Sequence, residues 1–309
     1  MPTIIVVGAV DEDHTKAIAA EVVHRGAGVH VIDTQRFPSA ERLSWTEDGL
    51  IHNGQLLQAT AVCLRAVFIS IATGDLDCRP DNDGWYSHYV DQQKKHSFMG
   101  SILRNLQLRG VKVVNPQPTF DMHFLKLFQI ALLQSRGVRL PRTLATNDPT
   151  AVRQFVAREN QVICKPMAGG ALASMLTPDD LSDERLATLT RAPVLFQEYI
   201  PGDNVRMYLL HDRLLSAAVI ETDEVDYRQA VKGTREVHPP SDVIEASLRA
   251  MEACGMVFSG VDWKCTPQGE WVLLECNPTP LFLGFEERVG RPILAPLVDY
   301  LVSQHVSSG

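Results

Sequence analysis

The chain has 309 residues, of which 45% are hydrophobic and 21% are charged, and this composition is typical of a globular protein of about two domains. Its formal net charge is −8, from 29 Lys and Arg against 37 Asp and Glu. Nucleic-acid binding needs a clustered basic surface for the phosphate contacts, and the sequence has no such cluster. The composition therefore argues against a nucleic-acid partner.

The N-terminal residues and the cysteines indicate the compartment. The N-terminus has no basic segment ahead of an apolar one, and no apolar run reaches the roughly 20 residues that span a bilayer. The six cysteines include no CxxC pair, and several lie in apolar, strand-like runs, which predicts buried free thiols. We therefore expect a cytoplasmic protein with no membrane partner.

The first third of the chain predicts an α/β domain, which we place at residues 1–117. A β-branched run over 3–7, a helical stretch over 14–25 and an apolar run over 29–32 follow the β-α-β order of a parallel sheet. The turn over 8–13 has one glycine and three acids where a pyrophosphate would need open backbone, which argues against dinucleotide binding. Strands over 51–53, 61–65 and 111–114 and a helix over 91–108 complete the domain.

The remaining two thirds of the chain also alternate helices with strands. Apolar spacing predicts helices over 120–135, 148–157 and 245–254. Strands are predicted over 162–164, 194–197, 206–210 and 214–220, followed by two more strands and a C-terminal helix. Helices and strands are thus expected along the whole length of the chain.

The most informative segment covers residues 259–279 and reads SGVDWKCTPQGEWVLLECNPT. Its PQGE sequence is a turn between two strand-like runs, so the segment predicts a β-hairpin. If the hairpin is symmetric about the centre of that turn, Asp262 lies opposite Glu275, with Cβ atoms about 5 Å apart. Asn277 is two residues beyond Glu275 and would project from the same face of the sheet.

These three side chains have the chemistry of a magnesium site. Two carboxylates placed opposite each other repel unless a cation lies between them, and oxygen-only ligands suit Mg²⁺. Glu275 also ends the apolar run WVLL, and a carboxylate at the end of a buried strand is rarely without a function. The alternative is a solvent-facing strand with incidental acids. We predict that Asp262, Glu275 and Asn277 bind the metal.

A phosphate site is predicted near the end of the strand over 162–164. Lys165 ends this strand, and the small residues that follow, including Gly169 and Gly170, let backbone N–H groups approach phosphate oxygens closely. The alternative for Lys165 is an ordinary surface lysine. The sequence contains no P-loop, protein-kinase or zinc signature that would offer another explanation.

In their order along the chain, these features resemble the ATP-grasp superfamily, in its RimK-like branch. The resemblance covers about residues 115–305, its most specific part is GVDW followed by LLECNP, and the N-terminal domain resembles the pre-ATP-grasp domain of that family. It implies an α/β ATP-grasp fold, in which two α+β lobes clasp ATP. The central lobe would be residues 118–198, and the C-terminal lobe, with the metal site, would be residues 199–309.

The resemblance also implies roles for individual residues. Lys126 and Lys165 would contact the ATP phosphates or adenine, and the loop with Gly169 and Gly170 would close over the phosphates. Arg206 would neutralise the triphosphate or an acyl phosphate; it lies in Asn204-Val205-Arg206, where RimK-like ligases usually have Asp-x-Arg. Asp203 would bind the ribose. The hinge between the lobes comprises Gln197, Glu198, Tyr199 and Ile200. It would hold adenine, with Glu198 and Ile200 acting mainly through backbone groups.

A narrower resemblance points to the graspetide synthetases, the microviridin-type peptide maturases. It rests on Asn115-Pro116, on PRT over 141–143, on TNDP over 146–149 and on Asp226-Tyr227-Arg228. It casts Arg228 as the group that binds the carboxylates of an acidic core peptide, for which a guanidinium is well suited. An ordinary exposed arginine is the alternative. The segment PTPLF over 278–282 departs from the longer polar stretch of that subfamily.

The implied reaction is an ATP-dependent ligation that needs one or two Mg²⁺ ions. A substrate carboxylate would attack the γ-phosphorus to give an acyl phosphate and ADP, and an amine or hydroxyl would then displace phosphate to form an amide or ester. We expect an acidic peptide or a small-molecule carboxylate as substrate and a homodimer or homotetramer as assembly. The alternatives are a small-molecule amino-acid ligase or a kinase of the same superfamily, and a non-catalytic nucleotide-binding protein.

Overall fold

The computed structural model describes residues 1–66, 84–167 and 172–303, so the predicted glycine loop at Gly169 and Gly170 lies outside the described residues. The chain divides into two compact units. The first contains residues 1–117, Leu281–Leu283 and the last helix, and the second contains Pro118–Pro280 and Gly284–Arg291. Among the described helices, none is long and apolar enough to cross a membrane.

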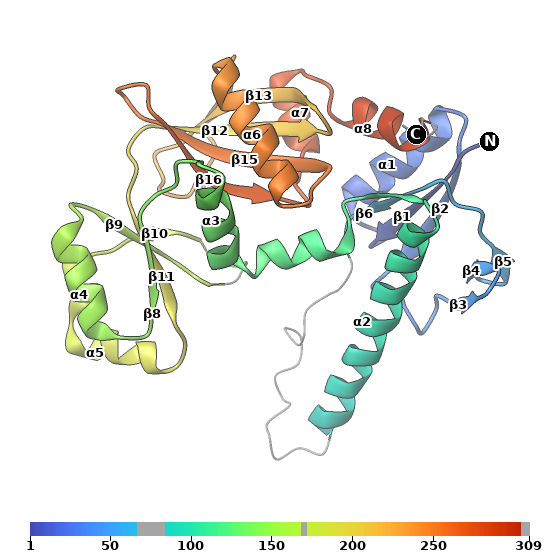
Figure 1. Cartoon of the computed structure of the whole chain (residues 1–309), viewed down its shortest axis with the longest axis horizontal. Coiled ribbons are helices and arrows are strands. Elements are labelled where there is room, and N and C mark those ends of the chain that lie inside the picture. The colour runs from blue at the N-terminus through green and yellow to red at the C-terminus, as the bar shows by residue number, and fades with distance from the viewer. Residues whose placement is uncertain (67–83, 168–171, 304–309) are drawn as a thin grey trace. The chain divides into compact units, whose positions relative to one another are not determined.

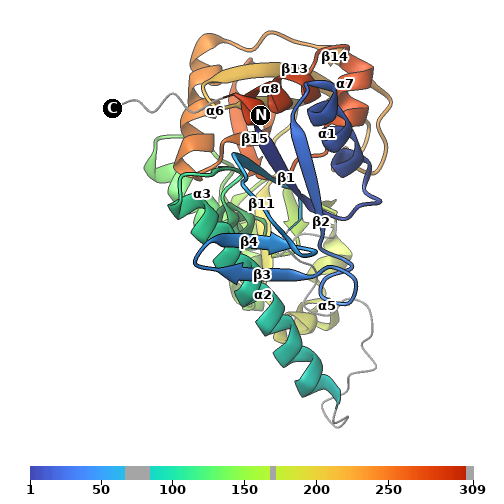
Figure 2. The same ribbon diagram turned by 90° about the vertical axis from the view of Figure 1, so that its right-hand side faces the viewer.

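The first unit is built on a parallel sheet with strand order β2-β1-β6-β7 (Figure 1). The residues between β2 and β6 form a small antiparallel sheet, β3-β4-β5, and Figure 2 shows β3 and β4 side by side. The elements are β1 (Thr3–Gly8), α1 (Asp13–His24), β2 (Gly28–Asp33), β3 (Leu43–Thr46), β4 (Gly49–His52), β5 (Gln55–Leu56), β6 (Ala61–Leu64), α2 (Gly84–Leu108), β7 (Lys112–Val114) and α8 (Leu294–Val302).

The last helix of the chain, α8, packs in the first unit because of both apolar and polar contacts. Leu297, Val298 and Leu301 are fully buried on its inner face. At its C-terminal end, the Lys112 ammonium donates hydrogen bonds to the carbonyl oxygens of Tyr300 (2.6 Å) and Ser303 (3.0 Å). A cation at this end of a helix satisfies carbonyl groups that have no partner within the helix.

The second unit contains two antiparallel sheets. The first has strand order β10-β9-β11-β8, and helix α4 packs on it through a small apolar core that includes Val152 and Phe155. Its elements are β8 (Thr143–Thr146), α4 (Pro149–Arg158), β9 (Val162–Lys165), β10 (Ser174–Met175), α5 (Asp183–Ala187) and β11 (Val194–Glu198), with 3₁₀ turns at Pro178–Leu181 and Thr188–Thr190.

The second sheet of this unit has strand order β14-β13-β12-β15-β16. Its strands are β12 (Asp203–Leu210), β13 (Arg213–Glu221), β14 (Gly233–Glu236), β15 (Phe258–Cys265) and β16 (Trp271–Asn277). The helices of this region are α3 (Lys126–Ser135), α6 (Ser241–Ala253) and α7 (Leu283–Val289).

Strand alternation divides the five-stranded sheet into an apolar face and a polar face. Val205, Met207 and Leu209 of β12 belong to one buried cluster, to which α3 and α6 also contribute. Side chains alternate along a strand, so Asn204 and Arg206 are directed to the opposite face. The apolar face thus forms the core of the unit, and the polar face is free to build a site.

The single helix predicted over 120–135 is in fact two segments. A 3₁₀ turn covers Gln117–His123, and α3 begins at Lys126 after Leu125, whose φ of −95° and ψ of 48° are not helical. The N–H groups of Phe124 and Leu125 both bond to the Asp121 carbonyl oxygen, which ends the first segment. The break places Lys126 in the first turn of α3.

Candidate active site

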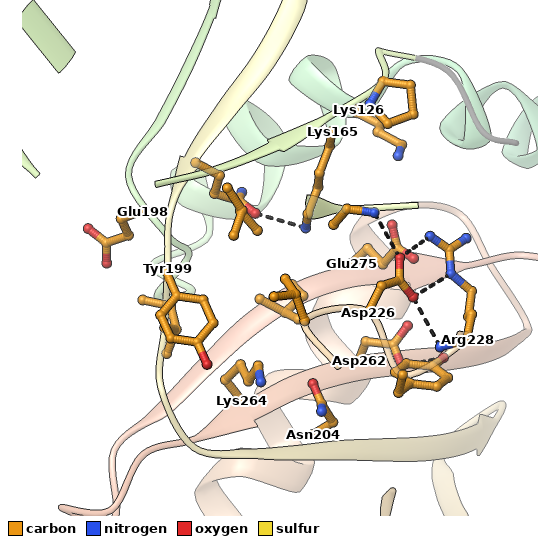
Figure 3. A pocket seen from close by; sticks show the side chains of 18 residues that line it. Lys126, Lys165, Glu198, Tyr199, Asn204, Asp226, Arg228, Asp262, Lys264 and Glu275 are labelled. Atoms are coloured by element: carbon orange, nitrogen blue, oxygen red, sulfur yellow. Dashed lines mark hydrogen bonds and ion pairs between the residues drawn. The ribbon is translucent and has the colours of Figure 1, made fainter. Parts of the chain in front are cut away.

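A cleft of about 780 Å³ lies between the two sheets of the second unit, and we call it the main cleft. Its walls come from β9, β11, β12, β15 and β16 and from the segment between β13 and β14 (Figure 3). A second hollow of about 690 Å³ adjoins it. The two spaces share the lining residues Lys126, Lys165, Gln197, Arg228, Leu274 and Glu275.

The hairpin of β15 and β16 presents its acids to these spaces. Asp262 pairs with Glu275, as the sequence predicted, and both line the main cleft. Closer to the turn, however, Trp263 pairs with Leu273, so Leu274 is an extra residue in β16. Such a bulge bends the strand and changes which face the following residues occupy. As a result, Leu273 packs in the core while both Leu274 and Glu275 face the cleft.

Asp262 is held by Arg206, which is its direct neighbour on β12. The Arg206 guanidinium donates to the Asp262 carboxylate over 2.5 Å, and only 6% and 8% of the two side chains are exposed. The guanidinium lies over Gly260, where an added Cβ would come within 2.4 Å of the Arg206 Nη2 atom. Gly260 is therefore required for the ion pair to form in this position.

The electrostatics of this pair leave room for another cation. Burial acts to lower the pKa of Arg206, but the Asp262 carboxylate, together with Tyr227 and Tyr208, holds that pKa well above its ordinary value. Burial and the nearby Glu275 raise the pKa of Asp262, and Arg206 opposes them. One guanidinium thus does not remove the repulsion between the two carboxylates, and a divalent ion would.

The donor set fits magnesium. Glu275 has no hydrogen-bond or ion-pair partner in the part of the chain that the structure describes, although it lines both spaces. Asn277 lines the second hollow, and its Oδ1 accepts the Thr279 N–H over 3.0 Å, which orients the amide and leaves a second lone pair on that oxygen. Within the described residues, no three His, Cys, Asp or Glu side chains form a metal site, and Asn277 adds an amide oxygen to the two carboxylates.

Two lysines supply positive charge at the junction of the two spaces. The Lys165 ammonium donates to Gln197 Oε1 over 2.9 Å, and Gln197 in turn donates to Thr143 Oγ1 over 3.0 Å. Burial lowers the pKa of Lys165, and Glu275 acts against it. Lys126 has no hydrogen-bond or ion-pair partner among the described residues. An anionic ligand would therefore meet two ammonium groups: that of Lys165, which Gln197 holds in place, and that of Lys126, which has no partner among the described residues.

The hinge after β11 directs backbone groups, rather than carboxylates, to the cleft. The Glu198 carboxylate is bound by Arg142 over 2.6 Å, and Figure 3 shows it directed away from Asp262 and Lys165. The N–H groups of Glu198 and Tyr199 are also bonded, to the carbonyl oxygens of Arg142 and Gln161. The N–H of Ile200 has no hydrogen-bond partner among the described residues and is the group that an adenine edge could use.

The residues after the hinge differ from the expected ribose site. Asp203 lies in a separate surface hollow and is 3.5 Å from Arg235, whereas its neighbour Asn204 lines the main cleft. Lys264 also lines the cleft, where it donates to the Gly202 carbonyl oxygen over 3.1 Å and lies 5.9 Å from the Tyr199 ring. Asn204 and Lys264 thus line the main cleft, whereas Asp203 does not.

Arg206 and Arg228 occupy different positions relative to the cleft. Arg206 is not among the lining residues of either space, so its contact is Asp262 rather than the cavity. Arg228 lines both spaces, its side chain is 52% exposed, and its Nε and Nη2 donate to the two oxygens of Asp226. Asp226 also accepts the Ala173 N–H over 3.0 Å. Arg228 is therefore held in place at the cleft wall.

Several site residues were not singled out from the sequence. His123 and Gln129 line the second hollow, and Asn204, Tyr227 and Lys264 line the main cleft. Strand alternation carries a usable signal for Lys264, because it is two residues after Asp262 and shares its face. His123 has no comparable signal from strand alternation, and it lines the second hollow from the end of the 3₁₀ turn.

The whole chain is similar to solved ATP-grasp ligases. It is 34% identical to the ATP-grasp ligase PsnB complexed with a minimal precursor, covering 98% of this chain and 99% of that one, with a TM-score of 0.87. The chain is an ATP-grasp ligase. Another PsnB structure, complexed with precursor, Mg and ADP, is 33% identical over 97% of both chains, with a TM-score of 0.84. The predicted ATP-grasp fold is confirmed.

Other proteins share this fold or are similar to part of the sequence. The fold is shared with the macrocyclase MdnC from Microcystis aeruginosa MRC bound with precursor peptide MdnA, at 20% identity over 98% and 99% of the chains and a TM-score of 0.77. "Probable alpha-L-glutamate ligase 1" of Shewanella sp. (strain W3-18-1) is 26% identical in an alignment of 222 residues that covers 66% of this chain and 72% of that protein. No family model matches the sequence.

Proposed function

We propose that this ligase modifies an acidic peptide by joining its side-chain carboxylates to amine or hydroxyl groups. The observation that carries the proposal is the 34% identity, over nearly the full length, to a ligase that was solved with its precursor. Arg228, held by Asp226 at the cleft wall, supports it because a positioned guanidinium recognises a carboxylate in a bidentate manner.

ATP is proposed to bind in the main cleft, between a central lobe at residues 118–198 and the lobe that begins at residue 199. The backbone of Glu198 and Ile200 would hold the adenine edge beside Tyr199. The triphosphate would extend toward Lys126 and Lys165, which line the junction with the second hollow. Gln197 would keep the Lys165 ammonium in place, and Asn204 and Lys264 would contact the ribose.

Magnesium is proposed to bind Asp262, Glu275 and Asn277, where it would neutralise charge on the phosphate oxygens. Arg206 then has a positioning role, because it holds Asp262 without lining the cleft itself. A loose phosphoryl-transfer transition state needs positioning and charge stabilisation more than covalent help from the protein. The lysines and Arg228 supply both to the reacting groups.

The reaction is proposed to proceed in two steps. The substrate carboxylate, oriented by Arg228, attacks the γ-phosphorus, and an acyl phosphate and ADP result. An amine or hydroxyl then attacks the carbonyl carbon and phosphate leaves. Exclusion of water from the cleft by the bound substrates would protect the acyl phosphate from hydrolysis.

The experiment combines the purified ligase with ATP, Mg²⁺ and a short synthetic peptide rich in Glu, Asp, Ser, Thr and Lys. We expect the peptide mass to fall by one water per bond, with release of ADP and phosphate. Arg228→Ala should weaken peptide use while ATP affinity stays nearly unchanged, and an equal loss of both would contradict its role. Retention of the phosphoryl group on the product would instead indicate a kinase.

The second candidate is a small-molecule ligase that uses free amino acids, which the similarity to the Shewanella ligase favours. Free glutamate with candidate acceptors, tested beside the peptide, separates the two. ADP release with free glutamate but not with the peptide would replace the peptide proposal.

The expected homodimer or homotetramer is a further proposal, which sedimentation velocity tests. The expected cytoplasmic location rests on the free cysteines of the described chain.

A further inference from the structure

The second hollow contains a histidine that the proposed steps do not use. His123 lies at the end of the 3₁₀ turn, three residues before Lys126, and lines this hollow together with Glu275 and Asn277. Apolar side chains of Met122, Ile130 and Leu195 form other parts of the wall. The hollow thus offers an apolar surface beside a titratable nitrogen. Lys126 and Lys165, which line the main cleft, also line this hollow.

The imidazole of His123 is oriented by one hydrogen bond. Its Nε2 is 2.9 Å from the hydroxyl oxygen of Thr279, and the ring of Phe120 packs edge-on against it. Thr279 is itself tied to the metal loop through its N–H, which donates to Asn277 Oδ1. Nδ1 has no hydrogen-bond partner among the described residues. If Nε2–H donates to Thr279, Nδ1 carries the lone pair.

The charges around the hollow favour the neutral ring. Burial lowers the pKa of His123, Glu275 acts against this, and Lys126 adds to it. The other titratable groups that face the hollow are Lys165 on β9, Arg228 before β14 and Cys276 on β16. The three cations, Lys126, Lys165 and Arg228, outnumber the one carboxylate of Glu275. A further positive charge on the His123 ring is therefore disfavoured. A neutral imidazole can accept a proton.

We propose that the second hollow receives the acceptor side chain of the peptide and that His123 Nδ1 takes the proton from its nucleophilic atom. The proposal rests on the proposed ligase reaction and specifies its second step. The amine nitrogen or hydroxyl oxygen forms a bond to the carbonyl carbon, and the bond from that carbon to the phosphate oxygen breaks. The nucleophile's proton passes to Nδ1, the electron pair leaves with phosphate, and the imidazolium later releases the proton to solvent.

The position of the hollow supports an acceptor rather than a second nucleotide phosphate site. It shares Glu275, Lys126 and Arg228 with the main cleft, so a group bound there can reach an acyl phosphate formed at the junction. Its apolar wall fits the methylene groups of an acceptor such as lysine. General bases of this kind contribute roughly 10²- to 10⁴-fold to a rate.

The test uses His123→Gln, which keeps a nitrogen donor for Thr279 but provides no base. His211→Asn is the matched control, because His211 lies on the β12–β13 turn with a φ of 55°, a conformation that asparagine tolerates. Each protein receives ATP, Mg²⁺ and the same synthetic acidic peptide with lysine as acceptor. Three rates are measured: ADP release, dehydrated peptide by mass, and peptide hydroxamate with added hydroxylamine, which attacks an acyl phosphate without the help of a base.

We expect His123→Gln to form bonds at least roughly 100-fold more slowly. ADP release and hydroxamate should stay near wild type, so more ADP is released per bond. In the wild type, bond formation should fall as the pH drops below the ordinary histidine value of 6.5, because the pKa of His123 is lowered, and the variant should lack this fall. Normal bond formation in the variant overturns the proposal.

A parallel loss of hydroxamate and ADP release in the variant would also overturn it, because His123 would then serve the first step. His123→Asn, which lacks the Thr279 contact, checks that the result does not depend on one replacement. If the wild-type enzyme forms hydroxamate with free glutamate but not with the peptide, the proposed peptide substrate is wrong. That result differs from a defect that is confined to His123→Gln, so the two proposals can fail separately.

Discussion

Replacement of Arg206 by methionine distinguishes the role implied by family resemblance from the one the fold indicates. If Arg206 contacts the triphosphate, its loss should weaken ATP binding and leave the free protein about as stable. In the structure, however, Arg206 is bound to Asp262 over 2.5 Å with both side chains over nine-tenths buried. Arg206→Met should therefore destabilise the protein before any ligand is added.

The magnitude follows from the geometry of the pair. Two charges about 4 Å apart attract by about 4 kcal/mol at an effective dielectric constant of about 20. Removal of one partner leaves Asp262 buried, uncompensated and close to Glu275. Loss of one member of a buried pair typically costs about 3–5 kcal/mol. We expect a decrease of this size in the free energy of unfolding.

The assay is urea unfolding followed by circular dichroism, together with calorimetric ATP titration. Asp262→Asn should cost a similar amount, and the double variant should cost clearly less than the sum, because the two residues are coupled. Lys126→Met is the matched control: Lys126 forms no ion pair among the described residues, so stability should hold while ATP binding weakens by roughly tenfold. An Arg206→Met protein of unchanged stability would refute the reasoning.

Three further predictions concern the same cleft. Gly260→Ala places a Cβ 2.4 Å from Arg206 Nη2 and 2.8 Å from the Cβ of Pro280, so we expect about 1–3 kcal/mol of destabilisation in urea unfolding; an unchanged midpoint would count against this packing. Glu275→Gln removes a repulsive charge, so the free protein should be at least as stable while calorimetry shows loss of Mg²⁺-dependent ATP binding and turnover is abolished. Near-normal ADP production would contradict its metal role. Burial lowers the pKa of Lys165 from its ordinary value of 10.5. As the pH rises, the lysine therefore loses its charge before pH 10.5 is reached, and ATP affinity should decline over the same range. Affinity that stays constant up to pH 10.5, in a fluorescent-nucleotide titration, would show that Lys165 does not bind phosphate.

The position of the paired acids was predictable because it depends on local pattern. Two strand-like runs around a turn restrict which residues can face each other, and Asp262 does pair with Glu275. The assumed symmetric turn is nevertheless wrong: Cys265 pairs with Trp271, and Leu274 is an extra residue that restores the predicted partners beyond it. A one-residue difference in the turn and a one-residue bulge cancel, and neither has a signal in the hairpin sequence.

The directions of the charged side chains were not predictable from local pattern. Glu198 is turned to Arg142, Asp203 lies outside the cleft, and Arg206 holds Asp262 instead of lining the cavity. Each outcome depends on a partner far away in the sequence, whose distance is known only after the sheets have formed. A buried charge takes the direction in which it finds a counter-charge, because an unpaired one is costly.

The sequence by itself determined the order of helices and strands, the family, and the oxygen donors at the end of one hairpin. These follow from hydrophobic period, turn residues and short motifs, which act over a few residues. The tertiary structure decided which of the candidate residues face the cleft and added His123, Asn204 and Lys264 to them. That decision depends on contacts between strands and helices distant in sequence, where packing and charge pairing, rather than local preference, set the direction of a side chain.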